Sequence, residues 1–161
     1  MARQTQPQGG NPGFLFYVLW GAMVGSGFLY ALIAYILRAQ MTAEQIAKRA
    51  TESAALVNLL TMAFAAVSVT VGVLALFALP VLMKSAHPFM VFIVRLALCE
   101  SICIYGFVLS MMGASLQVSY SFMGAGIFCL VILMPTRELI EAAQKANEEA
   151  RNRRRGSESA D

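Results

Sequence analysis

Four long apolar runs constrain this chain more than any other feature. They cover residues 14–37, 54–83, 88–113 and 118–134. A bilayer core about 30 Å thick requires roughly 20 apolar residues in a helix, and each run meets or approaches that length. Hydrophobic residues form 58% of the chain, too many for an ordinary soluble domain of this size. The sequence therefore predicts an all-α fold, an integral membrane four-helix bundle spanning residues 14–135.

Two polar segments flank these runs. Residues 1–13 are rich in Gln, Gly and Pro and are expected to form a flexible tail. Residues 136–161 form a charged tail, expected to be helical to about 155 because Glu141 with Lys145 and Glu149 with Arg153 are spaced for surface ion pairs. We expect this helix to project into the cytoplasm, where residues 136–155 could dock a protein partner. Its basic end is either solvated or held by anionic lipid headgroups.

The distribution of Lys and Arg predicts the topology. One side of the four runs carries Arg3, Lys84 and the six basic residues of the tail, whereas the other carries Arg38, Lys48 and Arg49. Eight against three places both termini in the cytoplasm. The expectation is a multi-pass protein of the bacterial inner membrane whose surroundings are the lipid bilayer, with no nucleic-acid partner.

Small residues in three of the runs are spaced for close helix packing, within the chain or in a homo-oligomer or membrane complex. The residues are Gly21, Gly25, Ala65, Ser68, Gly72 and Gly106. Pro80 predicts a kink or tilt in the second run, which is longer than a bilayer needs. Thr42 and Gln45 predict a capping box that opens a helix before that run.

Glu100 is the most informative single residue, because it is an acid near the middle of the third run. At 1.5 Å per residue it lies roughly 18 Å from either surface, so it cannot reach water. An acid at that depth must be neutral, paired or beside a polar pathway, which suits reversible binding of a proton or small cation. The alternative is a permanently protonated acid that bonds to another helix.

Three neighbours of Glu100 could support it. Ser101 and Tyr105 carry hydroxyls that can donate to a carboxylate or stabilise a helix contact. Arg95 supplies the nearest charge, but five residues turn it about 140° away from Glu100. We therefore expect Arg95 either to extend toward the membrane surface or to pair across helices.

Several other site types are not expected. Cys99, Cys103 and Cys129 lie within apolar runs, where they behave as small hydrophobes without disulfides, and no third ligand accompanies Cys99 and Cys103 to hold a metal. His87 is either a solvated loop residue or a proton carrier. No nucleophile motif or phosphate loop is present, so we expect neither an enzyme nor a bound cofactor.

The third run also carries a resemblance. Glu100 is followed by Ile104, Tyr105, Gly106 and Val108, a pattern that resembles the ion-carrying helix of the rotor-ring proteolipid, subunit c, of rotary ATP synthases and ATPases. The resemblance implies that Glu100 binds a proton or sodium ion. It covers one helix closely and one hairpin in outline. The second run is less Gly-rich than the family's first helix, and this chain adds a span on either side.

Three functions follow as hypotheses. The first is a proteolipid-like membrane subunit that binds a proton or sodium ion at Glu100 within an oligomer. The second is a small proton-coupled transporter that shares Glu100 between proton and substrate. The third is a scaffold or assembly subunit without transport, docked through its charged tail.

Overall fold

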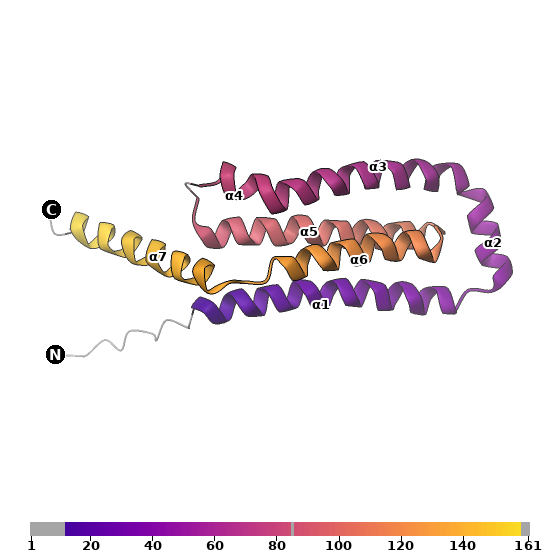
Figure 1. Cartoon of the computed structure of the whole chain (residues 1–161). Helices are drawn as coiled ribbons and strands as arrows, with labels where there is room; N and C mark the ends of the chain where they lie inside the picture. Colours follow the sequence, from indigo (N-terminus) through magenta and orange to yellow (C-terminus); the bar gives the residue numbers. More distant parts are fainter. Residues whose placement is uncertain (1–11, 85, 159–161) are drawn as a thin grey trace.

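The computed structural model describes residues 12–84 and 86–158, and this part of the chain is helical without strands (Figure 1). The elements are α1 (Pro12–Ala39), α2 (Ala43–Glu52), α3 (Ala54–Val73), η1 (Leu74–Ala78), α4 (Leu79–Leu82), α5 (Pro88–Met111), α6 (Leu116–Ile132) and α7 (Arg137–Glu158). The predicted flexible tail falls mostly outside the described residues, and Pro12 and Gly13 already belong to α1. The charged tail remains helical to Glu158.

Four rods lie side by side: α1, the continuous α3–η1–α4 segment, α5 and α6 (Figure 1). Helix α5 occupies the centre, because it packs against α1, α6 and α3. Among the long helices, α3 packs mainly against α5. Helix α2 crosses one end of the bundle, and α7 extends from the other (Figure 1). The arrangement is thus a compact α1–α5–α6 unit with α3 attached to one side of it.

Among residues 12–84 and 86–158, three segments are long and apolar enough to cross a membrane: Gly13–Ala39, Ala54–Leu82 and Pro88–Met111. Helix α6 has 17 residues, about 25 Å at 1.5 Å per residue, and it joins α7 at a 63° bend as a fourth candidate. Large apolar side chains cover the outward surface, including Leu59 at 66%, Phe77 at 69% and Leu82 at 72% exposure. An outer surface this apolar suits hydrocarbon better than water.

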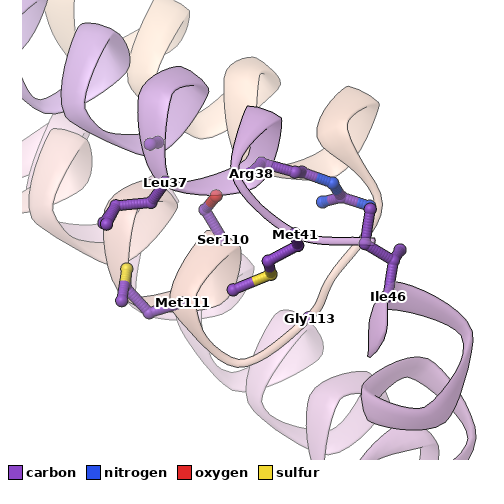
Figure 2. A pocket seen from close by; sticks show the side chains of 8 residues that line it. Leu37, Arg38, Met41, Ile46, Ser110, Met111 and Gly113 are labelled. Atoms are coloured by element: carbon purple, nitrogen blue, oxygen red, sulfur yellow. The ribbon is translucent and has the colours of Figure 1, made fainter. Parts of the chain in front are cut away.

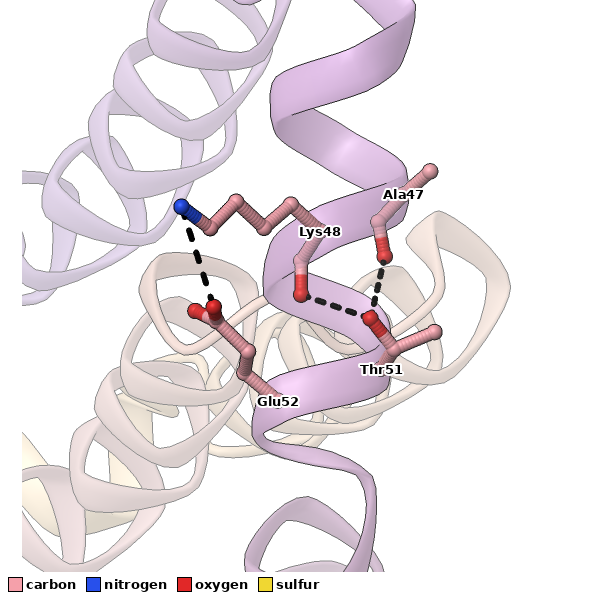
Figure 3. Close-up of polar contacts among 4 residues, drawn as sticks. All are labelled: Ala47, Lys48, Thr51 and Glu52. Atoms are coloured by element: carbon pink, nitrogen blue, oxygen red, sulfur yellow. Dashed lines mark hydrogen bonds and ion pairs between the residues drawn. The ribbon is translucent and has the colours of Figure 1, made fainter.

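Helix α2 begins with the predicted capping box. The Thr42 N–H donates to Gln45 Oε1 at 3.0 Å, and the Gln45 N–H donates to Thr42 Oγ1 at 3.3 Å. Lys48 pairs with Glu52 at 3.8 Å, and the Thr51 hydroxyl bonds back to the carbonyls of Ala47 and Lys48 (Figure 3). The prediction of the box is confirmed, and α2 forms a polar bridge between α1 and α3.

The α5–α6 hairpin is tight because glycine permits both its turn and its packing. Gly113 has φ 93°, a left-handed conformation that suits glycine. Its N–H donates to Ser110 O, and the next N–H, of Ala114, donates to Leu109 O, which is a Schellman motif. A Cβ on Gly106 would lie 2.6 Å from Ser119 O, and one on Gly126 would lie 2.8 Å from Cys103 N. Backbones this close exclude any side chain at those two positions.

The first turns of α7 are docked on the bundle. Ala143 is 1% exposed, and Leu139 and Ile140 pack against the core. His87 caps α5 by accepting from the Phe89 N–H at 3.3 Å, and its other ring nitrogen lies 3.1 Å from Asn147 Oδ1 of α7. Leu139, Ile140 and Ala143 therefore form a contact surface between α7 and the bundle, and His87 links two helices.

Candidate functional site

Glu100 lies midway along α5 and faces α1. Its Oε1 atom is 2.5 Å from Ser26 Oγ and 3.4 Å from Tyr30 Oη. Ser26 and Tyr30 are four residues apart on α1, so their side chains share one face of that helix. Ser26 also lies midway along α1, hence the two helices bring their central residues together. A polar contact thus joins the first and third long helices halfway along both.

The hydrogen bonds of the Ser26 hydroxyl depend on whether Glu100 is protonated or ionised. Ser26 Oγ lies 2.7 Å from Met23 O as well as 2.5 Å from Glu100 Oε1. A serine hydroxyl has one hydrogen, and a carbonyl oxygen has none to give. Both contacts are hydrogen bonds if Ser26 donates to Met23 O while a protonated Glu100 donates to Ser26 Oγ. An ionised Glu100 would instead compete with Met23 O for the same hydrogen.

Aromatic and small residues surround the contact between Glu100 and Ser26. The Tyr30 ring packs on Phe107 of α5, with centroids 5.7 Å apart. Gly27, next to Ser26, allows α1 to approach α6, since a Cβ there would lie 2.9 Å from Ile127 Cγ1 and 3.3 Å from Cys103 Sγ. Glu100 itself remains half-buried. Within the described residues no basic side chain forms an ion pair with it.

Ser101 and Tyr105 make contacts other than with Glu100, and Tyr105 stabilises a helix contact, one of its two expected roles. Ser101 donates its hydrogen to Leu98 O of its own helix at 2.7 Å. Tyr105 stacks on Phe64 of α3, with centroids 4.7 Å apart and planes 16° from parallel. Ser101 and Tyr105 therefore make these contacts in place of hydrogen bonds to Glu100. The hydroxyls at Glu100 come from α1, where Ser26 lies in the sequence at the same predicted depth as the acid.

Arg95 also differs from expectation. Its Nε–H donates to Ala75 O at 2.6 Å, and its Nη2 lies 3.5 Å from Leu76 O. Both acceptors belong to η1, so the side chain crosses to the neighbouring rod. Arg95 is not part of the Glu100 contact. Of its two expected positions, pairing across helices is the closer description, although its partners are carbonyls and not a charge.

The packing residues divide between the inside and the outside of the bundle. Gly106 lies in the α5–α6 contact. Gly21, Gly25 and Gly72 have open space where a side chain would stand, and Ala65 is exposed. Ser68 Oγ is buried without a hydrogen-bond partner. The close approaches inside the chain use Gly27, Gly106 and Gly126, so the other small residues are available for contacts outside it.

A small pocket lies at the α2 end of the bundle (Figure 2), with room for about one water at roughly 20 Å³. Arg38, Met41 and Ser110 are among its lining residues, and Arg38 Nη1 donates to Ala114 O at 2.6 Å. Its position and size make it a gap at a capped helix end, not a substrate cavity.

Cys99, Cys103 and Cys129 are free, and no group of three metal-binding side chains occurs in residues 12–84 and 86–158.

Comparisons with known protein families, curated proteins and solved structures give no match to this chain. The resemblance to the rotor-ring proteolipid stands on the motif after Glu100. Glu100 takes its hydroxyl partners from α1 and not from α3, which precedes α5 in the chain.

Proposed function

We propose that this chain is a multi-pass membrane protein in which Glu100 reversibly binds a proton. The observation that carries the proposal is the Ser26 hydroxyl, which lies within hydrogen-bond distance of both Met23 O and Glu100 Oε1. When Glu100 holds the proton, Ser26 can donate to Met23 O while Glu100 donates to Ser26 Oγ. Loss of the proton leaves the single Ser26 hydrogen to be shared, so protonation alters the α1–α5 contact directly.

Other features support reversible binding over a fixed ion pair. Glu100 is half-buried, and within the described residues no basic side chain forms an ion pair with it. Arg95 is engaged with carbonyls of η1 and does not hold Glu100 in its ionised form. Tyr30 Oη, at 3.4 Å, is placed to donate to the carboxylate once it forms. The site therefore offers partners to both forms of the acid.

Labelling with a hydrophobic carbodiimide tests the proposal, because the reagent attacks protonated carboxyls in the bilayer. We expect labelling at Glu100 to fall as pH rises, measured by mass spectrometry of the protein in liposomes, with Glu100→Gln as the blank. Absence of labelling at every pH in the folded protein would contradict a proton site. Equal labelling at every pH would show a permanently protonated structural acid. Protection by sodium at fixed pH would show that the ion is sodium.

Matched variants connect the labelling to the geometry. Ser26→Ala and Tyr30→Phe should move the pH midpoint of labelling, since each removes a hydroxyl beside Glu100. Ser101→Ala and Tyr105→Phe should leave it unchanged, because those hydroxyls belong to other contacts. Proton flux into liposomes then separates the possible uses of the site. Flux lost in Glu100→Gln supports transport, and equal flux in both proteins supports a scaffold.

The proposal includes the membrane placement and the association state. Four spans with both termini in the cytoplasm of a bacterial inner membrane agree with the charge count, and α7 and the α4–α5 connection share one end of the bundle (Figure 1). Thiol labelling of single cysteines at Lys84 and Lys48 would test the sidedness. The open small residues Gly25, Ala65 and Gly72 favour an oligomer. A monomeric mass in mild detergent would exclude it.

A further inference from the structure

Arg95 carries a positive charge that the proposed proton site at Glu100 does not involve. It lies seven residues after Pro88, about 10 Å along α5 from the α7 end. Its hydrogen-bond acceptors are the neutral carbonyls of Ala75 and Leu76. The described residues contain one ion pair, Lys48–Glu52, and that pair lies in α2 at the other end of the bundle. The Arg95 guanidinium is therefore a cation without an anion inside a membrane-length helix.

The backbone of η1 and the following Pro80 explain why Arg95 bonds to the carbonyls of Ala75 and Leu76. In the π-helical turn η1 the Leu79 N–H bonds to Leu74 O, one residue beyond its usual acceptor Ala75 O. The next residue, Pro80, has no N–H to give. Ala75 O consequently lacks its usual α-helical and π-helical donors, and Leu76 O lacks its usual α-helical donor. Arg95 fills these vacancies, which fixes its guanidinium between α5 and the η1–α4 segment.

The bonds to Ala75 O and Leu76 O occupy fewer than half of the Arg95 N–H groups. Arginine has five N–H donors, and the bonds to Ala75 O and Leu76 O take two of them. Three N–H groups and the full positive charge remain, on a side chain that is partly exposed. An unpaired charge in hydrocarbon costs several kcal/mol on insertion scales. No acidic side chain of the described residues pairs with that charge.

We propose that the phosphate of an anionic phospholipid binds the Arg95 guanidinium beside η1. Planar guanidinium groups recognise phosphate through paired N–H donors. Lys84 is exposed just after α4 at the same end of the bundle and supplies a second positive charge for the headgroup. Phe77, Val81 and Leu82 are 61–72% exposed on η1 and α4 and offer apolar surface to acyl chains. The site is separate from Glu100 and does not depend on proton binding there.

Lipid binding to the purified full-length protein in neutral detergent tests this site. Phosphatidylglycerol is compared with phosphatidylcholine of the same acyl chains, with bound lipid counted by native mass spectrometry. We expect phosphatidylglycerol to bind roughly tenfold more tightly, because two basic side chains face its headgroup. Arg95→Gln should abolish the preference while it keeps an N–H donor for Ala75 O. Arg95→Lys should retain most of it.

Two further variants keep the test decisive. Lys84→Gln lies outside the helical contacts and should reduce the preference severalfold even if Arg95→Gln fails to fold. Arg38→Gln removes a basic residue at the opposite end and should leave the preference unchanged. Equal binding of the two lipids by the wild type would overturn the proposal. So would a preference that survives in folded Arg95→Gln, or one that Lys84→Gln leaves unchanged.

Discussion

The two sides of α5 are packed in different ways. Toward α6 the backbones approach through Gly106 and Gly126. Toward α3 the attachment uses side chains, namely Arg95 on the carbonyls of η1 and Tyr105 stacked on Phe64, and α3 has no buried residue. Backbone packing through glycine leaves little freedom, whereas bridging side chains can change rotamer.

This difference separates the two candidate sites. Glu100 and its partner Ser26 belong to the compact α1–α5–α6 unit, so their 2.5 Å contact is held by closely packed helices. Arg95 lies on the side where α3 is attached, beside a π-helical turn and a proline. The first arrangement suits a defined proton position, and the second suits a lipid that enters between helices.

The largest expected effect is at Gly126. Gly126→Ala should destabilise the protein by about 3 kcal/mol or more, because the new Cβ would meet the Cys103 backbone, which cannot move aside cheaply. Gly124→Ala on the same helix and Gly72→Ala on α3 have open space and should change stability by less than about 1 kcal/mol. Thermal unfolding in detergent measures all three. Equal losses at Gly126 and Gly72 would remove the distinction between the two sides.

An intermediate effect is expected at the turn between α5 and α6. Gly113→Ala should cost about 1–2 kcal/mol, since alanine is strained at φ 93°. Gly113→Asn should recover part of that loss, because asparagine tolerates the left-handed region. The same unfolding measurement applies. An unchanged stability in Gly113→Ala would show that the Schellman turn does not hold the hairpin.

The smallest effect is expected on the α3 side. Phe64→Ala should cost about 0.5–1.5 kcal/mol through loss of the stack on Tyr105. Hydrogen exchange should increase in residues 54–73 and remain unchanged in α6. Leu59→Ala, at an outward position, serves as the control. A similar increase in α6 would mean that α3 supports the whole bundle.

Prediction from the sequence succeeded where a local pattern was sufficient. The Thr42–Gln45 capping box occurs as expected. A π-helical turn, which was not predicted, precedes Pro80. A local pattern was not sufficient for the partners of Glu100, because its neighbours along α5, Ser101 and Tyr105, make other contacts. Ser26 and Tyr30 are on another helix, and no local pattern specifies which faces of two helices meet.

The sequence by itself determined the all-helical character, the length of the apolar helices and the presence of one acid midway along the third of them. These follow from hydrophobic run length and from helix geometry, which act within a single segment. The tertiary structure decided that Glu100 faces Ser26 of α1, that Arg95 caps η1 and that Gly27 and Gly126, not Gly21 and Gly25, pack inside the chain. Those outcomes depend on how each helix is rotated about its own axis. The surfaces of these helices are almost uniformly apolar, so the rotation is set by how well small and large side chains fit together.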